Sequence, residues 1–351
     1  MYRWRTFFSG FDLALFLPVL GLTLMGLVTM YSHVGDNGFF NKQLLWISAS
    51  IVVLVLASIP DYRSLRSGNT IFYFFLFTVA LLALVLVIGE VTLGAQSRFN
   101  LGFFSLQPAD PAKIVLILVL AKYFAKRHEQ IGDFKHIIIS GIYALGIFGL
   151  VFIQPDFGSA AILFLVWFGM VLVSGIKLRH LLTVFIIGLV TFAAMWQFVF
   201  FDYQKERIMT FIDPLADIQG SGYNADQLTV AIGSGGLLGK GVGYGTQSKL
   251  LFLPEFETDF IFAAYAEEWG LVGVTLLFIL FTILVWRLLY HANNSATNFE
   301  RLFTSGVAIL FVAHFFIHIG MNIGLLPVTG TTIPFLSYGG SHLITEMLAV
   351  G

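Results

Sequence analysis

The residues best suited to chemistry lie in and just after a glycine-rich segment of an otherwise apolar chain. Residues 233–241 read Gly-Ser-Gly-Gly-Leu-Leu-Gly-Lys-Gly, and the polar stretch ends at Asp259, where an apolar run begins. Glycines let backbone N–H groups approach and cradle an anion, and Lys240 adds positive charge. A Walker A motif is excluded, because Ser234 and Gly241 stand where Gly and Ser or Thr are required. Spacing alone leaves two interpretations open, a phosphate-binding loop and a tight loop without a ligand.

Asp259 also has two interpretations. Thr258 is a candidate N-cap, which would place Asp259 in the first turn of the following helix. There a carboxylate complements the helix dipole and stabilises by about 0.3–1 kcal/mol. The alternative is a general base, whose charge the helix N-terminus favours while burial raises its pKa toward a useful value. Residue types alone favour the first interpretation.

Two further acidic positions lie where apolar runs begin. Asp156 stands in the short turn Gln154-Pro-Asp-Phe-Gly, where it could cap the next helix, bind a cation or pair with Arg207. Asp110 and Lys113 are spaced i,i+3, so they can pair on one helix face. Lys113 could also extend toward the membrane surface, and it remains a candidate for a phosphate contact.

Glu267 and Glu268 lie inside an apolar run, where charged groups usually face a cavity or a partner. They predict a structural hydrogen bond or, alternatively, part of a proton or substrate path. His314 and His318 are four residues apart without a zinc-protease pattern, so we expect packing or hydrogen-bonding roles. Residues 327–341 contain two prolines and three glycines, which predicts broken backbone buried in protein or lining a wet cavity.

The elements that must position these residues are membrane helices. Hydrophobic residues make up 58% of the chain and charged residues only 11%, against about 25% charged in an average soluble domain. The absence of cysteine excludes disulfides, thiolate chemistry and cysteine metal sites. We therefore expect an all-α integral membrane protein with about ten transmembrane helices. The apolar runs are 11–33, 41–59, 71–90, 109–126, 136–153, 157–175, 181–200, 259–285, 303–325 and 334–351.

The distribution of Lys and Arg predicts the topology. These residues concentrate in the N-terminus and in short segments such as 122–135, which places the N-terminus in the cytoplasm. The long segment 201–258, between the seventh and eighth helices, then lies outside together with every motif-rich loop. Within it, 225–232 is expected to form a helix and 233–245 irregular backbone. The whole chain, 1–351, is expected to be a single domain. A final helix of eighteen residues rises only about 27 Å, which suggests a chain cut short.

The ordered set of outer motifs resembles the SEDS family (shape, elongation, division and sporulation), and among its members RodA more than FtsW. No single motif is specific, but together they span most of the chain in family order. The matching stretches are Gln154–Gly158, Asp202–Arg207, Asp213–Pro214, Gly222–Asn224 with Gln227, Ala231–Gly236, Gly239–Gly241, Gly245–Ser248, Leu253–Glu255, Thr258–Ala263, Glu267–Glu268, Pro327–Gly330 and Pro334–Ser341.

The resemblance implies a peptidoglycan glycosyltransferase in the bacterial cytoplasmic membrane. Such an enzyme polymerises lipid II at the outer face during cell elongation and shape maintenance, and it releases undecaprenyl diphosphate. Its expected partners are a class B penicillin-binding protein and membrane lipids, and no nucleic acid. The alternatives are a lipid II flippase or other transporter of lipid-linked substrates, and a non-catalytic scaffold for the penicillin-binding protein.

The same resemblance makes Asp259 the expected catalytic residue. If the reaction uses a divalent cation, Mg²⁺ or Mn²⁺, Asp156 or Asp259 is expected to hold it. The chain departs from the family pattern at Glu257, where His is usual, at Asp110, where Glu is usual, and at His342 and Glu346, which are usually apolar. The residues expected to bind substrate are Arg207, Lys240, Lys113, Arg98, Asp156, Gln154, Gln227, Gln247, Glu255 and Ser337.

Overall fold

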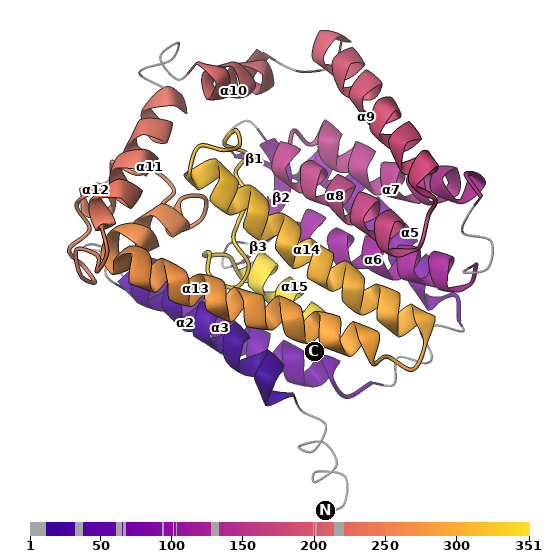
Figure 1. Ribbon diagram of the computed structural model, residues 1–351, viewed down its shortest axis with the longest axis horizontal. Helices are drawn as coiled ribbons and strands as arrows, with labels where there is room; N and C mark the ends of the chain where they lie inside the picture. The colour runs from indigo at the N-terminus through magenta and orange to yellow at the C-terminus, as the bar shows by residue number, and fades with distance from the viewer. Residues whose placement is uncertain are drawn as a thin grey trace, which may run out of the picture.

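The protein is an all-α integral membrane protein. The computed structural model describes residues 12–31, 38–60, 65, 68–92, 95–100, 102, 104–127, 133–198, 200, 202–213, 221–250 and 252–351. One helix overlaps each predicted apolar run, in order (Figure 1). These helices are α2 (Leu13–Tyr31), α3 (Gly38–Ala57), α5 (Thr70–Ile88), α6 (Ala109–Ala125), α7 (Lys135–Ile153), α8 (Phe157–Val173), α9 (Leu178–Phe198), α13 (Ile261–Asn293), α14 (Asn298–Asn322) and α15 (Gly340–Val350).

Length and composition identify the helices that can cross a membrane. Within the described residues, six are long and apolar enough: α2, α3, α5, α7, α13 and α14. Helix α5 contains no charged residue and exposes Phe77 and Val87. Continuous apolar runs fold as helices in lipid because a helix satisfies its own backbone hydrogen bonds. The chain is therefore a multi-pass protein, and the number of ten spans remains a prediction.

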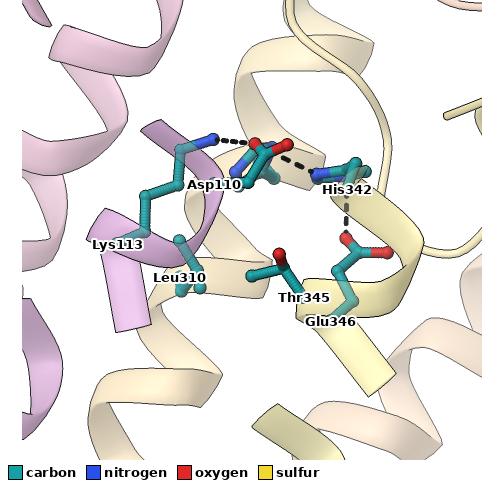
Figure 2. Close-up of a pocket in the computed structure, with 7 residues that line it drawn as sticks. Asp110, Lys113, Leu310, His342, Thr345 and Glu346 are labelled. Carbon is teal, nitrogen blue, oxygen red and sulfur yellow. Dashed lines mark hydrogen bonds and ion pairs between the residues drawn. The ribbon is translucent and has the colours of Figure 1, made fainter. Parts of the chain in front are cut away.

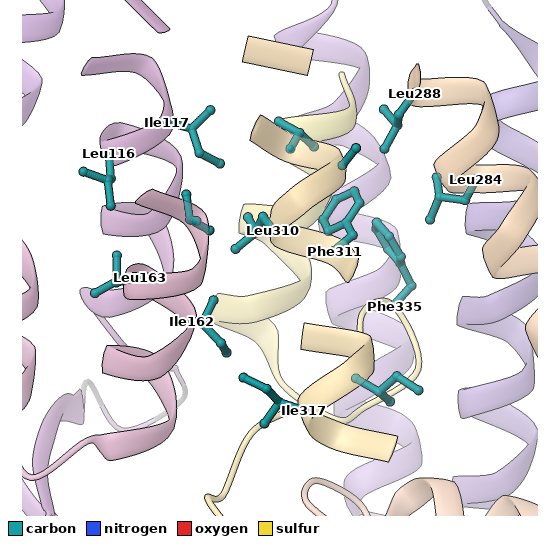
Figure 3. Close-up of a cluster of buried hydrophobic side chains, with 14 of the residues drawn as sticks. Leu116, Ile117, Ile162, Leu163, Leu284, Leu288, Leu310, Phe311, Ile317 and Phe335 are labelled. Carbon is teal, nitrogen blue, oxygen red and sulfur yellow. The ribbon is translucent and has the colours of Figure 1, made fainter. Parts of the chain in front are cut away.

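Helix α14 lies in the middle of the bundle. It packs against α13, α6 and α8, and α15 packs against α3 and α6. Figure 3 shows Ile117 of α6, Ile162 of α8 and Leu284 of α13 around Phe311 of α14. Phe335, from the segment that follows α14, meets Phe311 edge-on at 5.1 Å between ring centroids. The segment 323–339 is non-helical, as its prolines and glycines predict, and it is held inside the bundle.

A small sheet joins α5 to α6 and was not predicted. Strands β1 (Glu90–Thr92), β2 (Ala95–Asn100) and β3 (Ser105–Leu106) pair antiparallel in the order β1-β2-β3. In the register, Arg98 lies opposite Glu90 and Phe99 opposite Leu106. Strands of two to six residues carry too few alternating positions to stand out from a loop in the sequence.

The long segment before α13 folds back on the bundle. It contains α10 (Asp202–Ile212), α11 (Ser221–Gly235) and α12 (Thr246–Lys249), and α11 packs against α13. The predicted helix at 225–232 is thus confirmed, with further turns at both ends. Irregular backbone runs from Gly236 to Gly245, where positive φ angles at Gly236, Gly239 and Gly241 require glycine.

Helix α13 is broken at Gly270, where φ is 63° and ψ is −165°. The glycine-rich segment supplies the backbone partners that the break leaves open. Leu271 N donates to the Gly236 carbonyl at 3.0 Å, and Val272 N donates to the Leu237 carbonyl at 3.1 Å. In return, the N–H groups of residues 240 and 241 donate to the carbonyls of residues 267 and 268, each at 3.0 Å. We call this arrangement, residues 236–241 against 267–272, the glycine clasp.

Candidate active site

The backbone around Asp259 is fixed from one side. The carbonyls of residues 257, 258 and 259 each accept a hydrogen bond from α14 or from the segment that follows it. The donors are Tyr338 N at 2.8 Å, Ser337 Oγ at 2.8 Å and Asn322 Nδ2 at 3.0 Å, in that order. Ser337 and Asn322 are buried. The peptide that carries Asp259 is therefore held rigidly at the edge of the bundle.

The prediction that Thr258 caps α13 is wrong. The helix begins at Ile261, and its N-cap is Phe260, whose side chain has no hydrogen-bonding group. The Glu255 carbonyl accepts from the N–H groups of the three residues 258, 259 and 260. These hydrogen bonds close a tight turn before the helix. Asp259 thus precedes the helix and lies outside its first turn.

The Asp259 side chain is partly exposed and faces the segment after α14. A Cβ atom at Gly330 would lie 3.4 Å from Asp259 Oδ2. Gly330 also has a φ of 70°, a conformation that side chains rarely adopt. A side chain at this position would therefore lie directly against the Asp259 carboxylate.

Asp156 caps α8, as one of the sequence interpretations predicts. Its Oδ1 accepts from Ser159 N at 3.0 Å, and its Oδ2 accepts from Gln107 Nε2 at 2.7 Å. Gln107 N in turn donates to Ser341 Oγ at 3.2 Å. These contacts join the N-terminal ends of α6, α8 and α15. A Cβ atom at Gly158 would lie 2.7 Å from the Thr329 carbonyl, so the same segment, 327–341, borders both Asp156 and Asp259.

Glu267 and Lys240 form the polar centre of the glycine clasp. Glu267 is fully buried, and its Oε1 accepts from Lys240 Nζ at 2.7 Å, Thr246 N at 2.8 Å and Gln247 N at 3.1 Å. The adjacent Glu268 accepts from Gly243 N at 3.0 Å. The structural interpretation of the two glutamates is confirmed, and Lys240 is paired with a carboxylate.

Lys113 lies inside the bundle and does not extend outward. Its Nζ is 3.1 Å from Asp110 Oδ1, and their side chains are 4% and 6% exposed. The predicted i,i+3 pair is therefore confirmed. Both residues line a small pocket with His314, His342 and Glu346 (Figure 2). His314 and His318 also contact the carbonyls of residues 332 and 331 through Nδ1, as hydrogen-bonding residues should.

The remaining predicted site residues fall into separate surroundings. Gln154 is fully buried and donates to the Leu82 carbonyl at 2.9 Å. Arg98 is exposed on β2, and Gln227 is partly buried on α11. Arg207 belongs to α10, and its side chain is outside the described part of the structure.

The structure thus brings Ser337 and Glu255 to Asp259, and Gln247 to Lys240. Sequence reasoning missed Asn322 and Tyr338 as supports of Asp259. Tyr338 stands in a matching motif, but a lone Asn at the end of an apolar run gave no signal. Among the described residues, no group of three or more His, Asp and Glu side chains is placed to hold a metal ion. A divalent cation at Asp156 or Asp259 stays a prediction.

Comparison with known proteins gives consistent results along the whole chain. Residues 5–351 match the family model FTSW_RODA_SPOVE, described as cell cycle protein. The peptidoglycan glycosyltransferase MrdB of Escherichia coli is 36% identical, over 97% of this chain and 91% of its own length. The probable peptidoglycan glycosyltransferase FtsW of Thiomicrospira cyclica is also 36% identical, over 99% of this chain and 92% of its own length.

Solved structures agree. A chain of a peptidoglycan synthase complex, described for its structural coordination of polymerization and crosslinking, is 30% identical with a TM-score of 0.83. The alignment covers 97% of this chain and 95% of that one. The rod shape determining protein RodA of Thermus thermophilus is 29% identical with a TM-score of 0.73, over 97% and 94% of the two chains. This chain therefore belongs to the SEDS family of cell cycle proteins, which includes FtsW, RodA and SpoVE.

Proposed function

We propose that this protein is a peptidoglycan glycosyltransferase that polymerises lipid II at the outer face of the bacterial cytoplasmic membrane. Relatives that carry this activity in their names align over nearly all of the chain. The N-terminus is then cytoplasmic, and Asp259 and the segment 327–341 face outward. We further propose a class B penicillin-binding protein as the partner, because a chain of a peptidoglycan synthase complex shares the fold.

In the proposed reaction, Asp259 accepts the proton of the acceptor's GlcNAc 4-hydroxyl. The hydroxyl oxygen attacks the donor's anomeric carbon with inversion, and the bond from that carbon to undecaprenyl diphosphate breaks. The observation that carries this assignment is the support of Asp259: three successive carbonyls are held by donors, while residue 259 as a whole is only partly buried. A fixed backbone beside an accessible carboxylate is the preorganisation that a general base needs.

The leaving diphosphate requires positive charge near its oxygens. Lys113 and Lys240 are each paired with a buried carboxylate, whereas Arg98 is exposed on β2. We therefore assign the diphosphate first to Arg98. Arg207 of α10 is proposed as a further contact on the family resemblance alone. Lys240, whose side chain is 28% exposed, is a second candidate contact. To bind the diphosphate, its ammonium group would have to weaken its ion pair with Glu267.

The transporter alternative depended on Glu267 and Glu268 facing a path through the membrane. In the structure the carboxylates of both glutamates accept hydrogen bonds from the loop beside α13, at Lys240 and Gly243, which favours the enzyme.

The test is to incubate the purified protein with labelled lipid II, with and without a class B penicillin-binding protein, and to resolve glycan chains by gel. Polymer is the expected product. Movement of lipid II across liposomes without polymer would support a transporter instead. Activity that persists in the complex after Asp259→Asn would support a scaffold.

A further inference from the structure

A cluster of buried charged side chains lies between α6 and α15 (Figure 2), and it contacts the segment after α14 at Phe335. Lys113 and Asp110 come from α6, and His342 and Glu346 come from α15. His342 Nδ1 lies 3.8 Å from Asp110 Oδ1, and His342 Nε2 lies 2.8 Å from Glu346 Oε1. The side chains of His342 and Glu346 are 10% and 4% exposed. Neither residue has a part in the proposed reaction.

The second oxygen of Glu346 binds the segment after α14. Glu346 Oε2 accepts from Phe335 N at 2.8 Å. Phe335 is buried and has a φ of 62°, a conformation that is uncommon for any residue with a side chain and rarer for a bulky one. A backbone held in this conformation persists only when its surroundings hold it there. The Glu346 carboxylate and the packing of Phe335 on Phe311 are two such contacts.

The turn that Phe335 opens ends on the residues before Asp259. Ile333 N donates to Ser337 Oγ at 3.0 Å, and Ser337 Oγ donates to the Thr258 carbonyl at 2.8 Å. The next residue, Tyr338, donates through its N–H to the Glu257 carbonyl at 2.8 Å. A short path of hydrogen bonds and one turn of backbone thus leads from Glu346 to the peptide that carries Asp259.

We propose that Glu346 is a positioning residue for Asp259, an inference that rests on the proposed function. Burying a carboxylate is costly unless it has partners, and here the partners are His342 and the N–H of a strained turn. A leucine at this position would fill similar space but leave the buried Phe335 N–H without its acceptor. The turn would then relax, and Ser337 and Tyr338 would no longer hold the carbonyls of residues 257 and 258 in place.

Three variants test the proposal in the full-length protein. Glu346→Leu removes the acceptor, and Glu346→Gln keeps an oxygen that can accept from Phe335 N. Thr345→Val is the matched control, because Thr345 lines the same pocket and its hydroxyl donates within its own helix, to the Ser341 carbonyl. The measurements are kcat and KM for lipid II polymerisation, and amide hydrogen exchange of peptides covering 255–260 and 333–339.

We expect Glu346→Leu to lower kcat about 10- to 100-fold with KM unchanged, because misplacement of about 1 Å costs rates of this order. Exchange should rise in both peptides. Glu346→Gln and Thr345→Val should keep the wild-type kcat and exchange. If Glu346→Leu fails to fold, Ser337→Ala interrupts the same path one bond from Thr258 and should show the same loss of kcat.

Wild-type kcat in Glu346→Leu would overturn the positioning role. An equal loss of kcat in Glu346→Gln would also overturn it, because the charge of Glu346, and not its hydrogen bond to Phe335 N, would then be what matters. Failure of the proposed function looks different. In that case the wild-type protein makes no polymer, while the exchange data still report whether Glu346 holds the turn.

Discussion

Replacing Gly270 with alanine should destabilise the protein through the glycine clasp. With φ at 63° and ψ at −165°, Gly270 lies in a region of backbone conformation that is essentially confined to glycine. A Cβ atom there would lie 2.2 Å from Gly239 N and 2.7 Å from the Leu237 carbonyl oxygen. Both neighbours are backbone atoms, so a side-chain rotation cannot relieve the clash.

The magnitude follows from strain and lost hydrogen bonds. The strained conformation costs about 1–3 kcal/mol in a residue with a side chain. Movement of the loop away from α13 would break the bonds from Leu271 N and Val272 N, each worth about 0.5–1.5 kcal/mol. The free energy of unfolding should therefore fall by about 2–6 kcal/mol.

Thermal unfolding of the purified protein in detergent measures this effect, with Gly233→Ala as the matched control. Gly233 lies in α11, and a Cβ atom there would meet nothing within 4 Å. That substitution should stabilise by about 0.5–1 kcal/mol, since alanine loses less freedom in a helix. Equal midpoints for Gly270→Ala and Gly233→Ala would refute the clasp.

Three further substitutions test neighbouring parts of the account. Glu267→Ala leaves the donors of residues 240, 246 and 247 without their acceptor; the loss in unfolding free energy should be about 3 kcal/mol or more, and proteolysis between residues 236 and 250 should become faster. Ser337→Ala removes two hydrogen bonds and should cost about 1–3 kcal/mol in stability, measured by the thermal midpoint. Burial raises the pKa of Glu257 above its ordinary value of 4.5, and the charge of Glu255 acts in the same direction. The protonated Glu257 carboxyl therefore makes its full contribution to the free energy of unfolding below pH 4.5, and this contribution is lost as the pH rises through the higher pKa of the folded state. Glu257→Gln stays neutral, so its thermal midpoint should rise relative to that of wild type as the pH increases through this interval.

The helices were predictable from sequence because membrane helices are defined by local composition. Each apolar run in the sequence corresponds to a helix, and Asp156 and the Asp110–Lys113 pair act as their spacing predicts. These features depend on residues at most a turn apart. Motif order along the chain also indicated the family.

Apart from the short strands β1–β3 and the local turn before α13, the features that were missed depend on contacts between distant segments. Gly270 resembles any glycine of an apolar run, and its break in α13 depends on Gly239, far away in the chain. Lys240 looked like an anion-binding residue because its partner, Glu267, lies in a different segment. The support of Asp259 by Asn322 is equally invisible before the chain is folded.

The most direct test of the central claim is lipid II polymerisation by the purified Asp259→Asn variant. Asp226→Asn is the matched control, since Asp226 is an exposed residue on α11, in the same segment that precedes α13. We predict glycan chains from wild type and Asp226→Asn, and none from a folded Asp259→Asn with the wild-type thermal midpoint. Full-length glycan chains from Asp259→Asn at the wild-type rate would contradict the assignment of Asp259 as the base.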